Sequence, residues 1–336
     1  MSADPLLTIA APAPSAQAPS DRWFGIDTGG EPFGLFCGCL LAISASVSFA
    51  WSRVGILSGM LPADLTLLRF GVAGLILLPV LLRFGILSLA GIGWPRGLAL
   101  LVTGGPLFIL PQAAGYIYAP LAHGGVIAPS TVTIFSTIMA AAFLGERLSK
   151  AHVVGACMVI AGIVLISWHG LYATPGSRTW IGDLLFVGSS TLWAGFTVLV
   201  RLWRLEALRA IAVVSVLSAP LMALGYLAFV GLPHLRGLPT GSLIVQGLLQ
   251  GGLQGVVGIV GYSHAIRVLG VSRAVLFPAS VPAVSILIGI PILGEIPTVE
   301  QITGVVLVTA GLVYAVGAFN RRQRSKGESI DLFPRS

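Results

Sequence analysis

Charged residues are scarce in this chain. Asp, Glu, Lys and Arg make up only 9% of its 336 residues, against about 25% in a typical soluble domain. Apolar residues make up 56%, and the mean hydropathy is +0.95. This composition excludes a soluble globular protein and indicates an integral membrane protein. The net charge of +7 does not indicate nucleic-acid binding, because basic residues collect in cytoplasmic loops and at the anionic inner leaflet.

Residues that bind metals or cofactors are also few. The three cysteines, Cys37, Cys39 and Cys157, all lie in apolar runs, where we expect them to pack as small residues rather than form disulfides. The sequence has no His/Cys cluster with metal-ligand spacing and no GxxxxGK[ST] phosphate loop. We therefore expect no metal, no cofactor and no catalytic residues, and no ATP-driven transport by this chain alone.

Apolar runs of about 20 residues recur along the chain, each long enough to cross a hydrocarbon core of about 30 Å. Short breaks with Gly or Pro separate them, which is typical of turns. Before the first run, residues 1–31 are rich in Ala, Pro and Ser and are expected to form a disordered tail. The pattern predicts an all-α membrane protein with ten spans, at 33–52, 63–82, 97–118, 124–143, 151–169, 180–200, 210–230, 241–263, 273–293 and 299–319.

Lys and Arg are distributed unequally between the two sides of these spans. If the N-terminus is cytoplasmic, only Arg53, Arg178 and Arg236 fall in outside loops, and Arg69 lies within the second span. This asymmetry predicts a multi-pass protein with both termini in the cytoplasm, including a basic tail at residues 320–336. The inside segments hold Arg22, Arg83, Arg96, Arg147, Lys150, Arg201, Arg204, Arg209, Arg267, Arg273, Arg321, Arg322, Arg324, Lys326 and Arg335.

Two copies of one stretch organise the sequence. Residues 144–166 and residues 293–315 both begin with Leu-Gly-Glu, and each continues with a glycine and an Ala-Gly pair at matching offsets. This duplication predicts two repeats of five spans, at residues 32–170 and 171–319. Because five is odd, the second repeat is inverted relative to the first. In membrane proteins, inverted repeats indicate a secondary transporter with its substrate site near the bilayer midplane.

These motifs resemble the EamA-type members of the drug/metabolite transporter superfamily. The resemblance rests on Leu-Gly-Glu-Arg-Leu at 144–148 with Gly155 and Ala-Gly at 161–162, and on their second copies at 293–295, Gly304 and 310–311. Further matches are Arg-Phe at 69–70, Gly-Asp at 182–183, Trp-Ala at 193–194, and the prolines 129 and 278. The chain departs from the family pattern at Trp51, which comes late in the first span and precedes a serine.

The resemblance implies a ten-helix carrier of small metabolites, and bacterial members are often exporters. We expect an inner-membrane carrier that moves a small polar metabolite by alternating access, with amino-acid or related efflux as the leading interpretation. Drugs, vitamins or nucleotide sugars are the alternative cargo. A membrane-embedded lipid enzyme is less well supported, because such an enzyme needs a nucleophile, an acid/base pair or a metal set. The small solute and the bilayer are the expected partners, and a monomer is compatible with the sequence.

Three glutamines in the eighth span form the clearest polar pattern. Gln246, Gln250 and Gln254 recur at intervals of four and share one helical face. They line a solute cavity in one interpretation, and in the other they form hydrogen bonds between closely packed helices.

The third span contains two prolines that are expected to bend it, Pro106 and Pro111. Such breaks line cavities in carriers. Gln112 and Tyr116 are four residues apart and are candidates for the cavity wall; the alternative is a bent packing helix. We expect the selectivity cavity between spans three, four, eight and nine.

A charge inside a span needs a partner or water. Arg69 could bind a substrate carboxylate through two hydrogen bonds, but we favour a structural arginine near the outer boundary. Mid-span carboxylates are missing from the predicted spans, which favours facilitated or weakly coupled transport. A histidine near a span end, such as His123 or His264, could relay protons, but we expect it to be solvated.

The remaining candidates are single residues. Trp193 could stack on an apolar or aromatic substrate, whereas a buried hydroxyl more often bonds its own helix backbone. Pro129 and Pro278 are expected to act as hinges in spans four and nine. The other lining candidates are Ser44, Ser48, Ser130, Thr131 and Tyr262.

Overall fold

A computed structural model describes residues 22–23, 26–27, 30–145, 149–172 and 178–328. Apart from one antiparallel pair of two-residue strands, β1 (Arg22–Trp23) and β2 (Ile26–Asp27), the regular elements of the described residues are helices. The described residues contain nine helical spans long and apolar enough to cross a membrane, and Val299–Ala315 forms a shorter tenth stretch; two of the nine, Trp94–Tyr118 and Thr240–Leu269, consist of consecutive helical elements. The predicted all-α membrane fold is therefore confirmed.

The first repeat supplies six helices that make five spans. The third span is divided, because the chain breaks at Gly105 and restarts with Pro106, whose missing N–H suits the first turn of a helix. The helices are α1 (Glu31–Leu57), α2 (Pro62–Phe84), α3 (Trp94–Gly104), α4 (Pro106–Tyr118), α5 (Leu121–Leu144) and α6 (Lys150–Tyr172).

The second repeat is less regular. Its third span contains a π-helical segment, η1, flanked by two α-helices, and a short helix precedes its fourth span. The elements are α7 (Thr179–Leu202), α8 (Ala207–Phe229), α9 (Leu232–Gly237), α10 (Thr240–Gln246), η1 (Gly247–Gly258), α11 (Ile259–Leu269), α12 (Val271–Ala274), α13 (Leu276–Leu293) and α14 (Val299–Glu328). Helix α14 extends into the predicted C-terminal tail; most of residues 1–31 and all of 329–336 lie outside the described residues.

The repeated Leu-Gly-Glu sequence ends the fourth span of each repeat. Gly145 follows α5 and Gly294 follows α13, and both have a φ of +67°. In this left-handed conformation a side chain is strained, so glycine is the usual residue that closes a helix there. The same local physics therefore stops both helices, and Glu295 follows directly in the second copy.

The last helices of the two repeats, α6 and α14, pack side by side in opposite directions. A Cβ atom at Gly155 would lie 2.6 Å from the carbonyl oxygen of Gly311, and one at Gly162 would lie 2.6 Å from that of Gly304. As the numbers rise on α6 they fall on α14, so equivalent helices are antiparallel. The four repeated glycines allow this close contact, and the predicted inversion of the repeats is confirmed.

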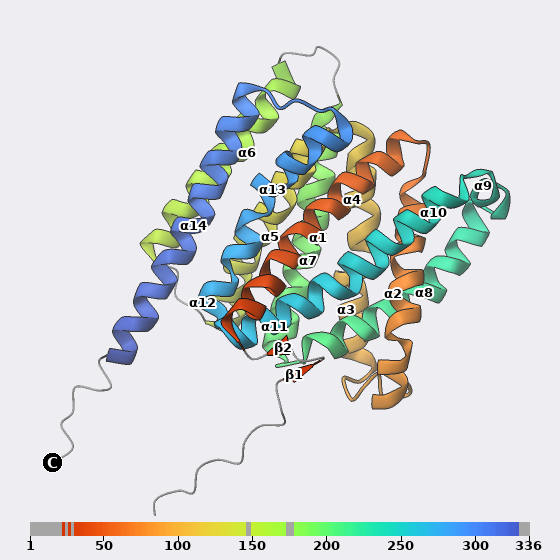
Figure 1. The fold of residues 1–336 in the computed structure, drawn as a ribbon, viewed down its shortest axis with the longest axis horizontal. Coiled ribbons are helices and arrows are strands. Elements are labelled where there is room, and N and C mark those ends of the chain that lie inside the picture. Colours follow the sequence, from red (N-terminus) through yellow and green to blue (C-terminus); the bar gives the residue numbers. More distant parts are fainter. Residues whose placement is uncertain (1–21, 24–25, 28–29, 146–148, 173–177, 329–336) are drawn as a thin grey trace, which may run out of the picture.

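The repeats exchange contacts throughout the molecule. Helix α1 packs against α11 and α13 of the second repeat, and α7 packs against α4 and α5 of the first. The second helices, α2 and α8, pack on each other, as do the fourth helices, α5 and α13. Figure 1 shows α6 and α14 at one edge of the molecule, α2 and α8 at the other, and the remaining long helices between them.

The long helices run between two ends of the molecule. Helix α1 starts at the end where Glu31 contacts Arg273 and finishes at the end where Arg53 contacts Glu295. We call these the Arg267 end, after a cavity residue described below, and the Glu295 end. The charges of the loops predict that the Glu295 end faces outside.

Candidate functional site

A small pocket lies between the two repeats, about midway along the helices. Its described lining residues come from α2, α3, α7, α8, η1 and α11. The cavity was expected between spans three, four, eight and nine, and of these only spans three and eight contribute described lining residues. Its volume is about 20 Å³, room for about one water molecule. We call it the Arg69 pocket; its lining residues are Arg69, Phe70, Ala73, Gly104, Trp193, Ile211, Val214, Ser215, Gly255 and Ile259.

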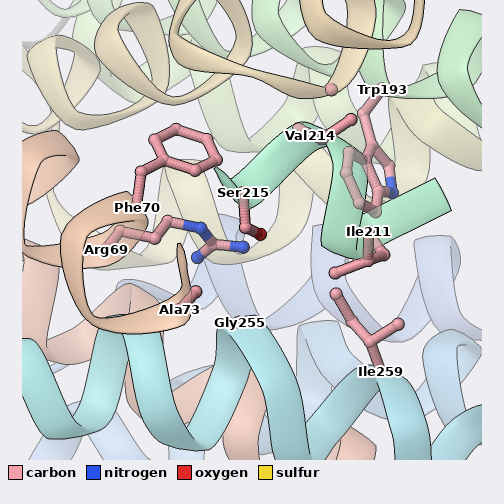
Figure 2. Close-up of a pocket in the computed structure, with 10 residues that line it drawn as sticks. Arg69, Phe70, Ala73, Trp193, Ile211, Val214, Ser215, Gly255 and Ile259 are labelled. Carbon is pink, nitrogen blue, oxygen red and sulfur yellow. The ribbon is translucent and has the colours of Figure 1, made fainter. Parts of the chain in front are cut away.

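Arg69 is the charged residue of this pocket. It is the eighth residue of α2, so it lies roughly 10 Å along the helix axis from the start of α2. Its side chain is half-buried and, within the described part of the chain, has neither an ion pair nor a hydrogen bond. Figure 2 shows the guanidinium group extending from α2 toward Ser215 of α8. Arg69 therefore lines the pocket, and the choice between a structural and a substrate-binding role stays a prediction.

An arginine without a partner inside a membrane span has a large energetic cost. An Arg side chain at the centre of a membrane helix costs about 2.5–3.5 kcal/mol on the insertion scale. Elsewhere in the structure, Arg53 offsets such a cost with a carboxylate partner. Arg69 has no such partner among the described residues, so water or an anionic ligand in the pocket would offset the cost.

The wall opposite Arg69 is aromatic and apolar. The ring of Trp193 stacks between those of Phe108 and Phe196, with centroid distances of 4.8 and 4.7 Å. These two contacts leave part of the indole facing the pocket. Trp193 was predicted to stack on a substrate, and this prediction is neither confirmed nor contradicted by its position.

A larger cavity, the Arg267 cavity, adjoins the pocket at the Arg267 end. Its volume is about 380 Å³, within the range of small-molecule sites. Ile211 and Ile259 line both spaces and face each other in Figure 2, so they separate the cavity from the pocket. The cavity is lined by Leu77, Glu206, Leu208, Ile211, Val256, Ile259, Val260, Ser263, His264 and Arg267.

At the opposite end, Glu295 binds two helices of the first repeat directly and a third through Arg53. Its carboxylate accepts hydrogen bonds from Arg53 Nε at 3.0 Å and from the backbone N–H of Leu121 at 2.8 Å. Arg53 also donates to the carbonyl oxygen of Tyr116 at 2.5 Å. We call these groups the Glu295 clasp. The clasp joins α1, α4 and α5 to the residue that follows α13, so separating the repeats at this end requires breaking it.

A second polar network closes the same end between α2 and α8. Asp64 is fully buried and accepts hydrogen bonds from the Tyr226 hydroxyl at 2.5 Å and from the backbone N–H of Leu61 at 2.7 Å. His234 Nε2 lies 3.1 Å from Oδ2 of Asp64, the oxygen that also accepts from Leu61. We call this the Asp64 network. Asp64 therefore caps α2 and also ties the two second helices together.

The expectation that His123 is solvated is wrong. Its side chain is 2% exposed, and its Nδ1 atom lies 2.8 Å from the carboxylate of Asp183 on α7. Helices α5 and α7 pack against each other near their N-termini and enclose the pair. Carboxylates within helices therefore do exist near the Glu295 end: Asp64 is buried and Asp183 is 14% exposed, although none was placed mid-span in the sequence.

The glutamine stripe faces a matching stripe of serines on α1. Gln254 Oε1 accepts a hydrogen bond from Ser44, and the Gln250 side chain bonds both Ser48 and Ser52. The first glutamine, Gln246, donates to the carbonyl oxygen of Trp51 at 2.6 Å. We call this the Ser–Gln ladder. In the described residues it joins η1 and α10 to α1, and its glutamines do not line the two cavities above. Their cavity role stays a prediction.

The other predicted lining residues lie away from the Arg69 pocket. Gln112 and Tyr116 are buried in α4, and the Tyr116 ring packs on Gly124 and Phe186. Ser130 donates to its own helix at Val126, as expected for a buried hydroxyl, and Tyr262 is half-buried on α11.

The predicted hinge prolines differ in position. Pro111 and Pro129 lie inside α4 and α5, and Pro106 follows the helix break. Pro278 lies in the first turn of α13, where proline does not disturb a helix, whereas Pro282 lies in its interior. Their role as hinges stays a prediction.

Of the pocket's lining residues, sequence reasoning proposed only Arg69 and Trp193 as site residues, and it missed among others Ile211, Ser215 and Ile259. They come from spans seven and eight and have no distinguishing pattern of their own. The serine stripe at residues 44, 48 and 52 could have been found, because it has the same four-residue interval as the glutamines.

Comparisons with known proteins agree with this architecture. A 26% identical relative from Streptantibioticus cattleyicolor, over 201 residues and 59% of this chain, is named a probable terminal-alkyne amino-acid exporter. The match spans 65% of that relative's length. A solved structure described only as the crystal structure of a protein shares the fold, with a TM-score of 0.59, 22% identity, and coverage of 84% of this chain and 98% of that one.

The family model gives the decisive match. The model of the EamA-like transporter family matches residues 32–168 and again residues 180–317, one match in each repeat. The prediction of a transporter rather than an enzyme is confirmed by this match. The chain is a multi-pass membrane protein, and it belongs to the EamA-like transporter family.

Proposed function

We propose that this transporter exports a small polar metabolite, an amino acid or a close derivative, by alternating access. We further propose that it lies in the inner membrane with both termini in the cytoplasm, and that its two repeats are residues 32–170 and 171–319. The loop charges support this orientation, since they place the Glu295 end outside.

One observation carries the proposal: the two ends of the molecule differ in how the helices meet beside the Arg69 pocket. The Arg267 cavity adjoins the pocket at one end, while the Glu295 clasp and the Asp64 network join the helices at the other. With the predicted orientation, this is a form that receives solute from the cytoplasm. Carriers of this architecture work by exchanging such a form with its opposite around a central site.

The relative supports the cargo class. Its name specifies the export of an amino acid with a terminal alkyne, a small solute with one carboxylate, one ammonium group and an apolar side chain. The Arg69 pocket combines a cation with apolar walls, which is compatible with such a molecule.

Solute counterflow in proteoliposomes tests this function. The vesicles are loaded with a mixed panel of unlabelled amino acids that includes L-propargylglycine, and labelled members are supplied outside, with and without a pH gradient. We expect exchange of one class of amino acid. Absence of exchange across the panel, with correctly inserted protein, would refute the amino-acid proposal and favour drugs, vitamins or nucleotide sugars. Turnover of a lipid without solute exchange would refute the carrier itself.

A further inference from the structure

We propose that Arg69 and Ser215 bind the carboxylate of the transported solute, and that the Trp193 side of the pocket selects an uncharged, apolar side chain. This inference rests on the proposed function, because it assumes that a small metabolite reaches the pocket. It adds a chemical rule: a carboxylate is required, and a side chain with a positive charge is rejected.

The requirement for a carboxylate follows from the unpaired guanidinium group. Arg53 and Arg69 are both arginines of the first two spans, but only Arg53 has a carboxylate partner within the described residues. A guanidinium group donates two parallel hydrogen bonds to a carboxylate, and this geometry is stronger than a single contact. The anion that is missing from the protein can therefore be supplied by the solute.

Ser215 provides a second polar contact at the same place. Its side chain is 4% exposed and lies on α8, opposite Arg69 on α2. Figure 2 shows the hydroxyl group beside the guanidinium group. A carboxylate between α2 and α8 could accept hydrogen bonds from both, so the bound solute would bridge the two repeats.

The rejection of cations follows from the rest of the lining. The described lining residues include no Asp or Glu, so a positively charged side chain would meet Arg69 without a compensating carboxylate. Phe70, Trp193 and Val214 instead provide apolar surface, where an aliphatic or alkynyl group gains by leaving water.

The size of the pocket makes the isoleucine pair a determinant of specificity. The pocket holds only about 20 Å³, so Ile211 and Ile259 must move before a solute from the Arg267 cavity can reach Arg69. The length of the apolar group that fits depends on how far these two side chains retract. Ile211→Ala should therefore favour longer apolar side chains.

The test compares four probes of similar size: L-propargylglycine, its methyl ester, pent-4-ynoic acid and but-3-yn-1-amine. Each competes against labelled L-propargylglycine in counterflow, and each is also tested for thermal stabilisation of the purified full-length protein. We expect the two carboxylates to compete at least tenfold better than the ester and the amine. Arg69→Gln should remove this discrimination, whereas Arg83→Gln, an exposed arginine on the same helix, should keep it.

The outcomes separate this inference from the proposed function. If the methyl ester or the amine competes as well as the acid in the unaltered protein, the carboxylate rule is wrong while amino-acid export stands. If L-propargylglycine and every other amino acid fail to exchange or to stabilise the protein, the proposal of amino-acid export is wrong, and the carboxylate rule is refuted with it. If Arg69→Gln does not fold, Arg69→Lys and Ser215→Ala replace it. Unchanged discrimination in both would overturn the assignment.

Discussion

The two ends of this transporter differ in how their charges are held. At the Glu295 end, Asp64 is fully buried and Glu295 is 26% exposed, and each carboxylate binds partners on other helices. At the Arg267 end, Glu31 and Arg273 form a pair in which both side chains are more than half exposed. Buried charges without partners are costly, whereas exposed pairs contribute little. Under the proposed alternating-access function, the barrier in this form therefore lies at the Glu295 end.

The comparison also shows how one repeat produces two different ends. The Leu-Gly-Glu sequence closes α5 and α13 in the same way, through a glycine in the left-handed conformation. Inversion then puts the first copy at the Arg267 end and the second at the Glu295 end. The helical framework is shared, but the side chains that meet at each end belong to different helices, so the two barriers need not have equal strength.

The largest effect is expected at Asp64. Asp64→Ala leaves the buried Tyr226 hydroxyl without its acceptor and removes the hydrogen bond to the N–H of Leu61. An unsatisfied buried group costs about 1–3 kcal/mol and a lost helix cap about 1 kcal/mol, so we expect roughly 2–4 kcal/mol of destabilisation. The measurement is the apparent melting temperature of the purified protein in detergent.

The matched variant at the Arg267 end is Glu206→Ala. Glu206 precedes α8, is 54% exposed and pairs with Arg209 one turn away. Removing such an exposed partner is expected to change stability by less than about 0.5 kcal/mol. Equal losses for Asp64→Ala and Glu206→Ala would contradict the difference between the two ends.

The next largest effect is expected at Glu295, and it concerns access from the Glu295 end to the pocket rather than the stability of the protein. Glu295→Gln keeps an acceptor for the N–H of Leu121 but leaves Arg53 without a counter-charge. The clasp is weakened, so the population open at the Glu295 end should rise by about tenfold, which corresponds to ~1.4 kcal/mol. The reporter is Ser215→Cys in a protein without native cysteines, labelled in spheroplasts by a membrane-impermeant maleimide.

Glu31→Gln is the control for this experiment, because it breaks the exposed pair with Arg273 at the other end. It should alter the labelling rate by less than twofold. The clasp would not act as the barrier if Glu295→Gln labelled at the parental rate, or if Glu31→Gln produced the same increase.

The sequence was sufficient to predict the framework on which these differences depend. Hydropathy located the spans, and the five-span period together with the loop charges predicted inverted repeats. These features are local or periodic, so they can be read without knowing which helices touch. The close contact of Gly155 with Gly311 then follows from the repeat itself, since equivalent helices meet around one axis.

The barrier and the pocket could not be predicted in this way. Tyr226 is 162 residues from Asp64, and Glu295 is 242 residues from Arg53. Nothing in the spacing of these residues indicates that they meet, because their contacts depend on the packing of helices from different repeats. The same reason explains why Arg69 was interpreted as a structural residue: its lack of a partner becomes visible only when its neighbours are known.

The smallest effect on access to the pocket is expected in the Ser–Gln ladder, which lies between the two ends. Gln250→Ala removes contacts with Ser48 and Ser52 on α1, and we expect a loss of about 1–2 kcal/mol in stability. Gln254→Ala should cost less, because Ser44 also donates to its own helix at Leu41. A double-mutant cycle with Ser48→Ala measures the direct coupling, which should be about 1 kcal/mol.

The ladder also sharpens the comparison of the two ends. Gln250 is the middle of the three glutamines. Its loss should therefore destabilise the form open at the Arg267 end and the form open at the Glu295 end equally, and it should change the labelling rate of Ser215→Cys by less than twofold. A several-fold change in labelling with unaltered stability would instead assign the glutamines to the solute path, as the cavity interpretation of the stripe predicts. In that case the barrier extends from the Glu295 clasp along α1 to the middle of the membrane.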